Sequence, residues 1–307
     1  MIPENFKSGI VALIGPPNAG KSTLLNAYIG QKISIVTPKP QTTRNRINGI
    51  LHRDDCQIVL LDTPGIHKSN ETLNRFLVET AWQALHGADC ILLLFDGTRY
   101  IDNLSLLDKE ISPLIEPLEK AKEKLLIAIN KIDKVKNKNL FLPVMEKIAQ
   151  YFSDVEIFLI SALTGEGIFE LLEEIKNRLP VGPPLFPEDQ VSSVPLRFMA
   201  AEIIREKLFF KLKKELPYSV AVEIEQWIEE REKNLTKIYA TIYVAKKNHK
   251  QIVIGQNGRM LKEVGKEARM ELEALLNTKV YLELWVKVKP KWNEDERFIA
   301  NLYAMEF

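Results

Sequence analysis

A glycine-rich loop near the start of the chain has the residue types and spacing of a phosphate-binding site. It reads Gly15-Pro16-Pro17-Asn18-Ala19-Gly20-Lys21-Ser22, which matches G-x-x-x-x-G-K-[ST] between an apolar run and a helical pattern. Glycines let successive backbone amides point at phosphate oxygens, and a helix N-terminus adds partial positive charge. We expect Lys21 to reach the β- and γ-phosphates and Ser22 to offer its hydroxyl to Mg²⁺. The stretch from Pro17 to Thr23 is therefore predicted to bind a nucleoside triphosphate.

An acidic turn after a second apolar run is the candidate partner of this loop. In Asp62-Thr63-Pro64-Gly65, the Asp62 carboxylate can hold Mg²⁺ through water and the Gly65 amide can bond the γ-phosphate. By itself, this tetrapeptide is also an ordinary turn signal. Between the two elements, Gln41-Thr42-Thr43-Arg44 offers a hydroxyl that would complete the Mg²⁺ shell when a γ-phosphate is present. We favour Thr43 over Thr42 as that ligand, and a solvated loop is the alternative.

The base is predicted from Asn130-Lys131-Ile132-Asp133, which ends another apolar run. The Asp133 carboxylate can accept hydrogen bonds from both N1–H and the 2-amino group of guanine, whereas adenine would leave it buried and unpaired. Lys131 would lie along the ring, and Asn130 would tie this loop to the phosphate loop. Ser161-Ala162-Leu163 follows a further apolar run and could present a backbone amide to the guanine carbonyl. The predicted ligands are GTP and GDP.

A second candidate site lies in the other half of the chain, around a G-x-x-G loop. Two close glycines let a backbone approach a phosphodiester chain, and the stretch from Lys246 to Arg269 has seven basic and two acidic residues. This pattern predicts a KH-type clamp on about four nucleotides of single-stranded nucleic acid. A small α+β domain with a solvated basic helix is the alternative. The predicted contact residues are Lys246, Lys247, His249, Lys250, Ile254, Gly255, Gln256, Asn257, Gly258, Arg259, Lys262 and Lys266.

Alternating strands and helices must position the first site. Short apolar runs predict buried strands, and periodic patterns between them predict helices. Such alternation is typical of a mainly parallel sheet wrapped by helices, with ligand loops beyond the carboxyl ends of the strands. The strands are expected at Ile10–Gly15, Gln57–Asp62, Cys90–Asp96, Leu125–Asn130 and Glu156–Ile160, and the helices at Lys21–Ile29, Thr72–Leu85, Ser105–Lys120, Phe141–Tyr151 and Ile168–Arg178.

A proline-rich stretch, Pro180–Pro187, ends that alternation and predicts a domain boundary. We expect an α/β P-loop NTPase domain over residues 1–180, a linker over 181–194 and a smaller α+β type II KH domain over 195–307 with a C-terminal tail. The second domain is predicted to begin with a basic helix whose apolar stripe packs on a sheet or whose basic flank meets anionic lipid or RNA. Its elements are expected at Leu196–Leu216, Ala221–Glu229, Lys237–Val244, from Gly258 to Leu276, and at Lys279–Lys287.

Composition excludes several other classes of protein. The 307 residues suit two domains, and 46% hydrophobic with 27% charged residues is ordinary for globular proteins. Two cysteines cannot build a disulfide framework, which favours a reducing compartment. The longest purely apolar run, Cys90–Phe95, is far below the roughly 18 residues of a membrane span. We see no secretory signal and expect a cytoplasmic protein, with peripheral contact at the inner membrane as a further expectation from the basic helix.

The motifs of the first half resemble the translation-factor-related GTPases. Three of them most resemble the Era branch: Gly15-Pro16-Pro17-Asn18, Gln41-Thr42-Thr43-Arg44 and Asp62-Thr63-Pro64-Gly65. With the second half included, the resemblance covers essentially the whole chain. It implies a GTP-hydrolysing switch whose KH domain binds single-stranded RNA near the 3′ end of small-subunit (16S) ribosomal RNA. It also implies a role in assembly and maturation of the 30S subunit.

One departure bears on the mechanism. Ras-like proteins orient the attacking water with a glutamine, and this chain has Ile66 after Gly65 instead. Relatives with an asparagine at the position of Asn18 use it to seat a monovalent cation, so the resemblance suggests potassium beside Mg²⁺. A plain turn residue is the alternative for Asn18. The candidate catalytic residues are Lys21, Asn18, Thr43 and Gly65, and slow intrinsic turnover is expected.

Two rival functions remain at this point. A P-loop metabolic kinase would share the phosphate loop, but Asn130-Lys131-Ile132-Asp133 argues against it because that loop fits guanine. An RNA-binding scaffold with a non-hydrolysing nucleotide site is the other rival. The scaffold is disfavoured by the intact Lys21, Ser22, Asp62 and Asp133.

Overall fold

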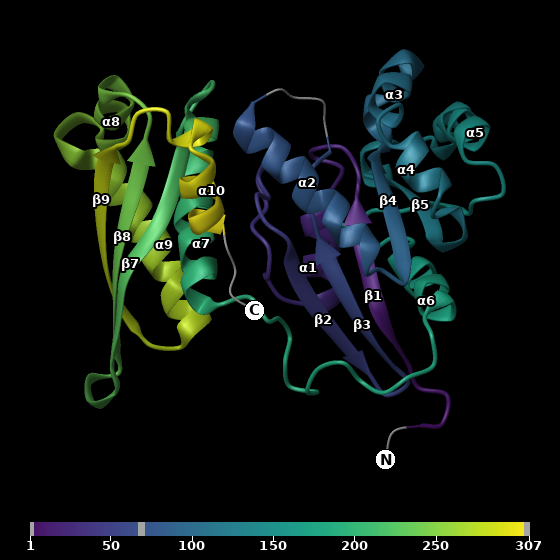
Figure 1. Ribbon diagram of the computed structural model, residues 1–307, viewed down its shortest axis with the longest axis horizontal. Helices are drawn as coiled ribbons and strands as arrows, with labels where there is room; N and C mark the ends of the chain where they lie inside the picture. Colours follow the sequence, from purple (N-terminus) through teal and green to yellow (C-terminus); the bar gives the residue numbers. More distant parts are fainter. Residues whose placement is uncertain (1–2, 67–70, 304–307) are drawn as a thin grey trace. The chain divides into compact units, whose positions relative to one another are not determined.

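The chain is divided into two compact units, each with its own sheet. The computed structural model describes residues 3–66 and 71–303 (Figure 1). Unit 1 comprises Met1–Ser34, Pro40–Asn70 and Asn74–Ser193, and unit 2 comprises Ile35–Lys39, Glu71–Leu73 and Val194–Phe307. The predicted domain limits at residues 180 and 195 stay a prediction.

The sheet of unit 1 has six strands in the order β2-β3-β1-β4-β5-β6. All neighbours pair in parallel except β2, which runs antiparallel to β3. The mainly parallel sheet that the sequence predicts is therefore confirmed, although β2 was not predicted because polar residues interrupt its apolar pattern. The strands are β1 (Lys7–Ile14), β2 (Ile47–Arg53), β3 (Cys56–Asp62), β4 (Cys90–Asp96), β5 (Leu125–Asn130) and β6 (Ile157–Leu159).

Helices flank this sheet (Figure 1), and every residue of β4 and β5 is buried, as expected for strands covered on both faces. The prediction of one helix over Ser105–Lys120 was wrong, since the chain turns between Ile111 and Ile115. Pro113 has no amide hydrogen with which to continue the helical ladder. The helices are α1 (Lys21–Ile29), α2 (Thr72–His86), α3 (Leu104–Ile111), α4 (Ile115–Glu119), α5 (Leu142–Tyr151) and α6 (Ile168–Arg178).

The proline-rich segment follows the edge of the unit 1 sheet. The buried side chain of Gln57 accepts from the amides of Leu185 and Phe186 and donates to the Phe186 carbonyl. The amide of Ile50 donates to the carbonyl of Val191 at 2.8 Å. The bond from Ile50 occupies a backbone amide that the edge strand β2 otherwise leaves open, and the bonds of Gln57 fasten the segment beside it.

Unit 2 packs helices against one face of a three-stranded sheet of order β7-β8-β9, with β7 antiparallel and β9 parallel to β8. The first helix ends at Lys211 rather than at Leu216 as predicted. Leu212 and Leu216 are both buried in the core, so a turn there mimics helical spacing. The elements are α7 (Leu196–Lys211), β7 (Val220–Glu230), β8 (Leu235–Val244), α8 (Lys247–Ile254), α9 (Arg259–Leu276), β9 (Lys279–Val288) and α10 (Glu296–Tyr303).

Three basic residues of α7 form ion pairs. Lys211 contacts Glu267 at 2.8 Å and Glu263 at 3.2 Å, and Lys207 contacts Glu206 at 2.8 Å. Arg205 is buried beside Glu202. Ion pairs within unit 2 therefore compensate part of the charge on which the expected contact with anionic lipid or RNA depends. Over the described residues, none of the helices combines the length and apolar character needed to cross a bilayer.

Candidate nucleotide site and nucleic-acid groove

The phosphate loop connects the end of β1 to the start of α1 and requires glycine at both ends. Gly15 has φ +141°, and a Cβ there would lie 2.1 Å from the Leu94 carbonyl oxygen. Gly20 has φ +100°, and its Cβ would lie 2.1 Å from the side-chain nitrogen of Asn130. Because L side chains rarely adopt such φ values, this tight curl is available only to glycine.

Lys21 begins α1 and is buried against the loop. Its ammonium donates to the carbonyl oxygens of Gly15 and Pro16, at 3.0 and 3.1 Å. Burial lowers the pKa of Lys21 to about 8, and the nearby Asp62 carboxylate opposes that shift. A cation desolvated in this way is stabilised by an anion, and phosphate oxygens between the loop and Lys21 would supply one.

Three hydroxyl groups converge on the buried carboxylate of Asp62 at the end of β3. Its Oδ2 accepts from Ser22 at 2.6 Å, from Ser34 at 2.8 Å and from Thr43 at 3.4 Å. The Ser22 and Thr43 hydroxyls are 2.9 Å apart. Burial raises the pKa of Asp62, and the hydrogen bonds of the three hydroxyls and the charge of Lys21 oppose that rise.

This oxygen cluster fits Mg²⁺. The Oδ1 atom of Asp62 is buried without a hydrogen-bond partner, so it can accept from a metal-bound water. Ser22 and Thr43 offer the hard hydroxyl oxygens that Mg²⁺ prefers. In the part of the chain that the structure describes, no group of three or more His, Cys, Asp or Glu side chains could hold a metal ion. A metal held here would therefore depend on hydroxyls, water and phosphate.

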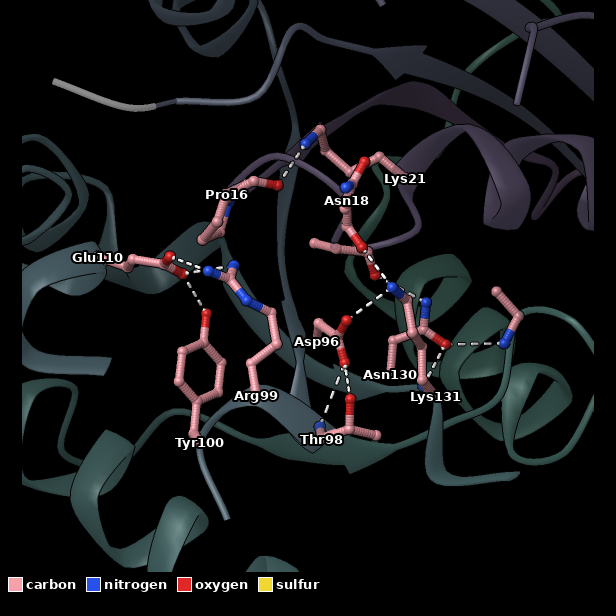
Figure 2. Close-up of polar contacts among 12 residues, drawn as sticks. Pro16, Asn18, Lys21, Asp96, Thr98, Arg99, Tyr100, Glu110, Asn130 and Lys131 are labelled. Carbon is pink, nitrogen blue, oxygen red and sulfur yellow. Dashed lines mark hydrogen bonds and ion pairs between the residues drawn. The ribbon is translucent and has the colours of Figure 1, made fainter. Parts of the chain in front are cut away.

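The base loop after β5 is fastened to the phosphate loop (Figure 2). The Asn130 side chain donates to the Ala19 carbonyl at 2.8 Å and accepts from the amides of Lys131 and Ala162. Asp133 accepts from the Ser161 hydroxyl at 2.6 Å. The loops after β1, β5 and β6 are thus one hydrogen-bonded assembly. The side chain of Leu163, in the loop after β6, is exposed.

Lys131 has a second anchor that sequence reasoning missed. Its ammonium donates to the Asn18 carbonyl at 2.6 Å and to the carboxylate of Asp96 at 2.7 Å, as Figure 2 shows. Asp96 also accepts from the Thr98 hydroxyl and amide, which fixes its orientation. Asp96 ends β4, between β1 and β5, and its place at that shared edge was the available signal.

Gly65 and Ile66 lie against the phosphate loop. A Cβ at Gly65 would come within 2.7 Å of the Cα of Pro17, so the chain approaches closely only without a side chain. The amide of Ile66 donates to the Gly15 carbonyl at 3.1 Å, and its side chain is buried in the core. An apolar side chain in this position cannot orient a water molecule by hydrogen bonding.

In unit 2, a cavity of about 1290 Å³ runs between α9 and the edge strand β9. Gly258, Lys262 and Lys266 of the predicted contact residues line it, together with Arg269, which sequence reasoning did not select. Leu261, Val280, Leu282 and Leu284 provide its apolar part, and Gly265 also lines it. The remaining predicted residues lie at the N-cap of α8, on α8, in the loop before α9 and at the first position of α9, namely Lys246, Lys247, His249, Lys250, Ile254, Gly255, Gln256, Asn257 and Arg259.

The loop between α8 and α9 has a left-handed backbone. Gly255 and Gly258 both have φ +73°, and Asn257 has φ +52°. Nothing lies within 4 Å of a Cβ built on Gly258, so this turn is open to solvent at the mouth of the cavity. Burial and the charge of Lys246 lower the pKa of His249, which favours a neutral imidazole beside the loop.

Comparison with known proteins identifies both units. Residues 10–131 match the family described as 50S ribosome-binding GTPase, and residues 215–293 match the KH domain family. The chain is 51% identical to the GTPase Era of Nitratidesulfovibrio vulgaris (strain DP4) over 296 residues, which cover 96% of each protein. It belongs to the Era family of GTPases. GTPase Era of Thermotoga maritima is 47% identical, with 97% of each chain covered.

Two solved Era structures share the fold with a TM-score of 0.87 and 41% identity, covering 97% of this chain and 99% of theirs. One is a variant of Aquifex aeolicus Era bound to GDP and AlF₄⁻. The other is Era in complex with MgGDPNP and nucleotides 1506–1542 of 16S ribosomal RNA. The predicted family and fold class, a P-loop GTPase domain followed by a KH domain, are confirmed.

The Asp96–Lys131 ion pair generates a first prediction. Asp96→Asn removes the charged partner of Lys131 and should weaken binding of GDP and GTP by about tenfold, since a hydrogen bond to a charged group contributes roughly 1.5–3 kcal/mol. Equilibrium titration with a fluorescent GDP measures the loss. Glu110→Gln is the control, because Glu110 binds Arg99 and Tyr100 instead (Figure 2). Equal losses in the two variants would contradict a specific role for Asp96.

Proposed function

We propose that this Era-family chain is a GTP-hydrolysing switch that binds single-stranded 16S ribosomal RNA near its 3′ end and acts in 30S subunit maturation. The observation that carries the proposal is the joint assembly of the phosphate loop and the base loop through Asn130 and Lys131. The basic groove of unit 2 supports the RNA part. The solved relative with MgGDPNP and 16S nucleotides supports both parts.

The nucleotide would lie along the curl from Pro17 to Thr23. Lys21 would donate to the β- and γ-phosphates, and the backbone amides of the loop would bind the remaining oxygens. Ser22 and Thr43 would bind Mg²⁺ directly and Asp62 through water. When bound, Mg²⁺ neutralises charge on the phosphate oxygens. Thr43 would join this set only with a γ-phosphate present, which would distinguish the two nucleotide states.

Hydrolysis would depend on charge stabilisation rather than on a general base. The Gly65 amide lies beside Pro17, where it can donate to the γ-phosphate, whereas the buried Ile66 has no polar group for a water. Slow intrinsic turnover follows from this arrangement. The kinase and scaffold alternatives receive no support from the comparisons.

Guanine recognition is tested by competition. GTP should displace fluorescent GDP at least 10⁴-fold more effectively than ATP, because adenine offers the Asp133 carboxylate neither an N1–H nor a 2-amino donor. Asp133→Asn should weaken GTP binding and improve binding of xanthosine triphosphate, whose 2-oxo group accepts from an amide. Displacement by ATP as effective as that by GTP would instead favour a metabolic kinase.

A bound potassium ion would supply positive charge near the phosphates. Asn18 supports this proposal through its place in the loop, with φ +63° and its carbonyl held by Lys131. Turnover should be faster in K⁺ than in Na⁺ by tenfold or more, given that one charge-stabilising donor contributes about 10²–10³. Asn18→Gly tolerates the same φ and should remove the difference. Equal turnover of the unaltered protein in both salts would refute the potassium role.

Nucleic-acid binding at the G-x-x-G loop is tested by one pair of variants. Asp and Asn both tolerate the left-handed backbone of Gly258, but only Gly258→Asp adds negative charge where a phosphate must approach. Gly258→Asp should weaken binding of a single-stranded 16S 3′-end oligonucleotide by about tenfold, and Gly258→Asn by much less. Filter binding or fluorescence anisotropy measures both. Normal binding by the Asp variant would make the KH assignment of this loop wrong.

Peripheral contact with the inner membrane through residues 196–216 stays a prediction. The ion pairs of Lys207 and Lys211 reduce the charge that α7 offers to a lipid surface. Co-sedimentation with anionic vesicles would measure any contact.

A further inference from the structure

Ser34 contributes a hydroxyl to the Asp62 cluster without belonging to any of the nucleotide-binding motifs. Its Oγ donates to Oδ2 of Asp62 at 2.8 Å, and both residues are fully buried. The other two donors, Ser22 and Thr43, are the proposed ligands of Mg²⁺. Ser34 is therefore the donor in this cluster that contacts the carboxylate without being a proposed metal ligand.

The side chain of Asn26 holds Ser34 in place. Asn26 Oδ1 accepts from the amides of Ile33 and Ser34, at 2.8 and 2.9 Å, and Asn26 Nδ2 donates to the Ser34 carbonyl at 2.7 Å. These three bonds leave the Ser34 backbone little freedom. The position of the Ser34 hydroxyl is therefore set by α1, the helix that carries Asn26.

The spacing of Ser22 and Asn26 explains how α1 can both contact Asp62 and hold Ser34. The two residues are four apart, so they lie on the same side of α1. Ser22 contacts Asp62 directly at 2.6 Å, and Asn26 reaches Asp62 through Ser34. The helix therefore fixes two contacts to the Asp62 carboxylate, one from Ser22 itself and one from Ser34, which Asn26 holds.

All three hydroxyls bind the same oxygen, Oδ2, while Oδ1 is buried and has no hydrogen-bond partner. A carboxylate fixed through one oxygen cannot rotate without breaking those bonds. The other oxygen then keeps a constant direction toward the place where the proposed metal-bound water would lie. Groups that orient metal ligands in this way commonly change metal affinity when they are removed.

We propose that Ser34, held by Asn26, is a positioning residue that orients Asp62 and so sets the affinity of the nucleotide site for Mg²⁺. This inference rests on the proposed magnesium-dependent GTP site. It predicts an effect on metal binding rather than on the fold, because Ser34→Ala removes one oxygen and no packed carbon.

The test measures release of fluorescent GDP from the full-length protein as a function of Mg²⁺ concentration, from excess chelator to millimolar Mg²⁺. Ser34→Ala should raise the Mg²⁺ concentration for half-maximal retention by roughly tenfold. Release in chelator should change less than twofold. Ser8→Ala is the matched control, because Ser8 is also buried in unit 1 and donates instead to the Pro183 carbonyl at 2.6 Å.

A double-variant cycle separates action through Asp62 from a general effect on the loop. If Ser34 acts through that carboxylate, Ser34→Ala should add nothing to the Mg²⁺ midpoint of Asp62→Asn. An unchanged midpoint in Ser34→Ala would overturn the proposal. Equal acceleration of release with and without Mg²⁺ would also overturn it, since that result means a loosened loop. If the rate of GDP release from the unaltered protein does not depend on Mg²⁺ concentration, the proposed metal requirement is refuted, and this inference with it.

Discussion

The nucleotide site depends on the compensation of two opposite charges that are buried at the carboxyl edge of one sheet. Removing Lys21 and Asp62 from water costs free energy unless donors, acceptors or counter-charges replace the lost hydration. The protein replaces the lost hydration with hydrogen bonds. Loop carbonyls accept from Lys21, and hydroxyls donate to Asp62. These partners compensate the charges only in part, because a carbonyl carries no full charge and Oδ1 of Asp62 has no hydrogen-bond partner. Negative phosphates and a divalent cation would complete the compensation, so the site suits that pair of ligands.

Parallel strand order makes this concentration of charge possible. The loops after β1, β3, β4 and β5 leave the same edge of the sheet, so Asn18, Asp62, Asp96 and Lys131 meet although they span more than a third of the chain. Asn130 and Lys131 then fix the loop after β5 to carbonyls of the loop after β1. The base loop and the phosphate loop are therefore held at one separation, which would favour a ligand of a definite length.

Some of this arrangement could be predicted from the sequence because it depends on local rules. The phosphate loop, the Asp62 turn and the base loop each combine special residues within four to eight positions, and buried parallel strands are continuous apolar runs. Ser34 could not be predicted, because a single serine acquires its role only when the fold brings it to Asp62. Asp96 was missed although it ends a predicted strand, because its role depends on the contact with Lys131 that the sheet creates. For the same reason β2 was missed, since its buried Asn48 is hydrogen-bonded by Ser192 and Ser193, which the sequence places far away. The predicted helix beyond Lys211 was wrong because burial of Leu212 and Leu216 reflects packing, not helical continuation.

In unit 2, the sequence likewise does not show which face of a helix carries its charge. The stretch from Lys246 to Arg269 carries an excess of basic residues, but this total does not show where the charge is available. On α9, Glu263, Glu267 and Glu271 form one row, and they pair with Lys211 and Lys207 of α7. Lys262, Lys266 and Arg269 form the neighbouring row, which lines the groove along β9. One residue along a helix is a rotation of about 100°, so adjacent letters in the sequence belong to different faces. The acidic row is consumed by packing within the unit, and the basic row is left to the groove. Lys262, Lys266, Arg269 and Lys279 line the groove together with two acidic residues, Glu273 and Glu283. The groove therefore keeps a basic excess that α9 as a whole lacks, and this excess would attract a phosphodiester chain.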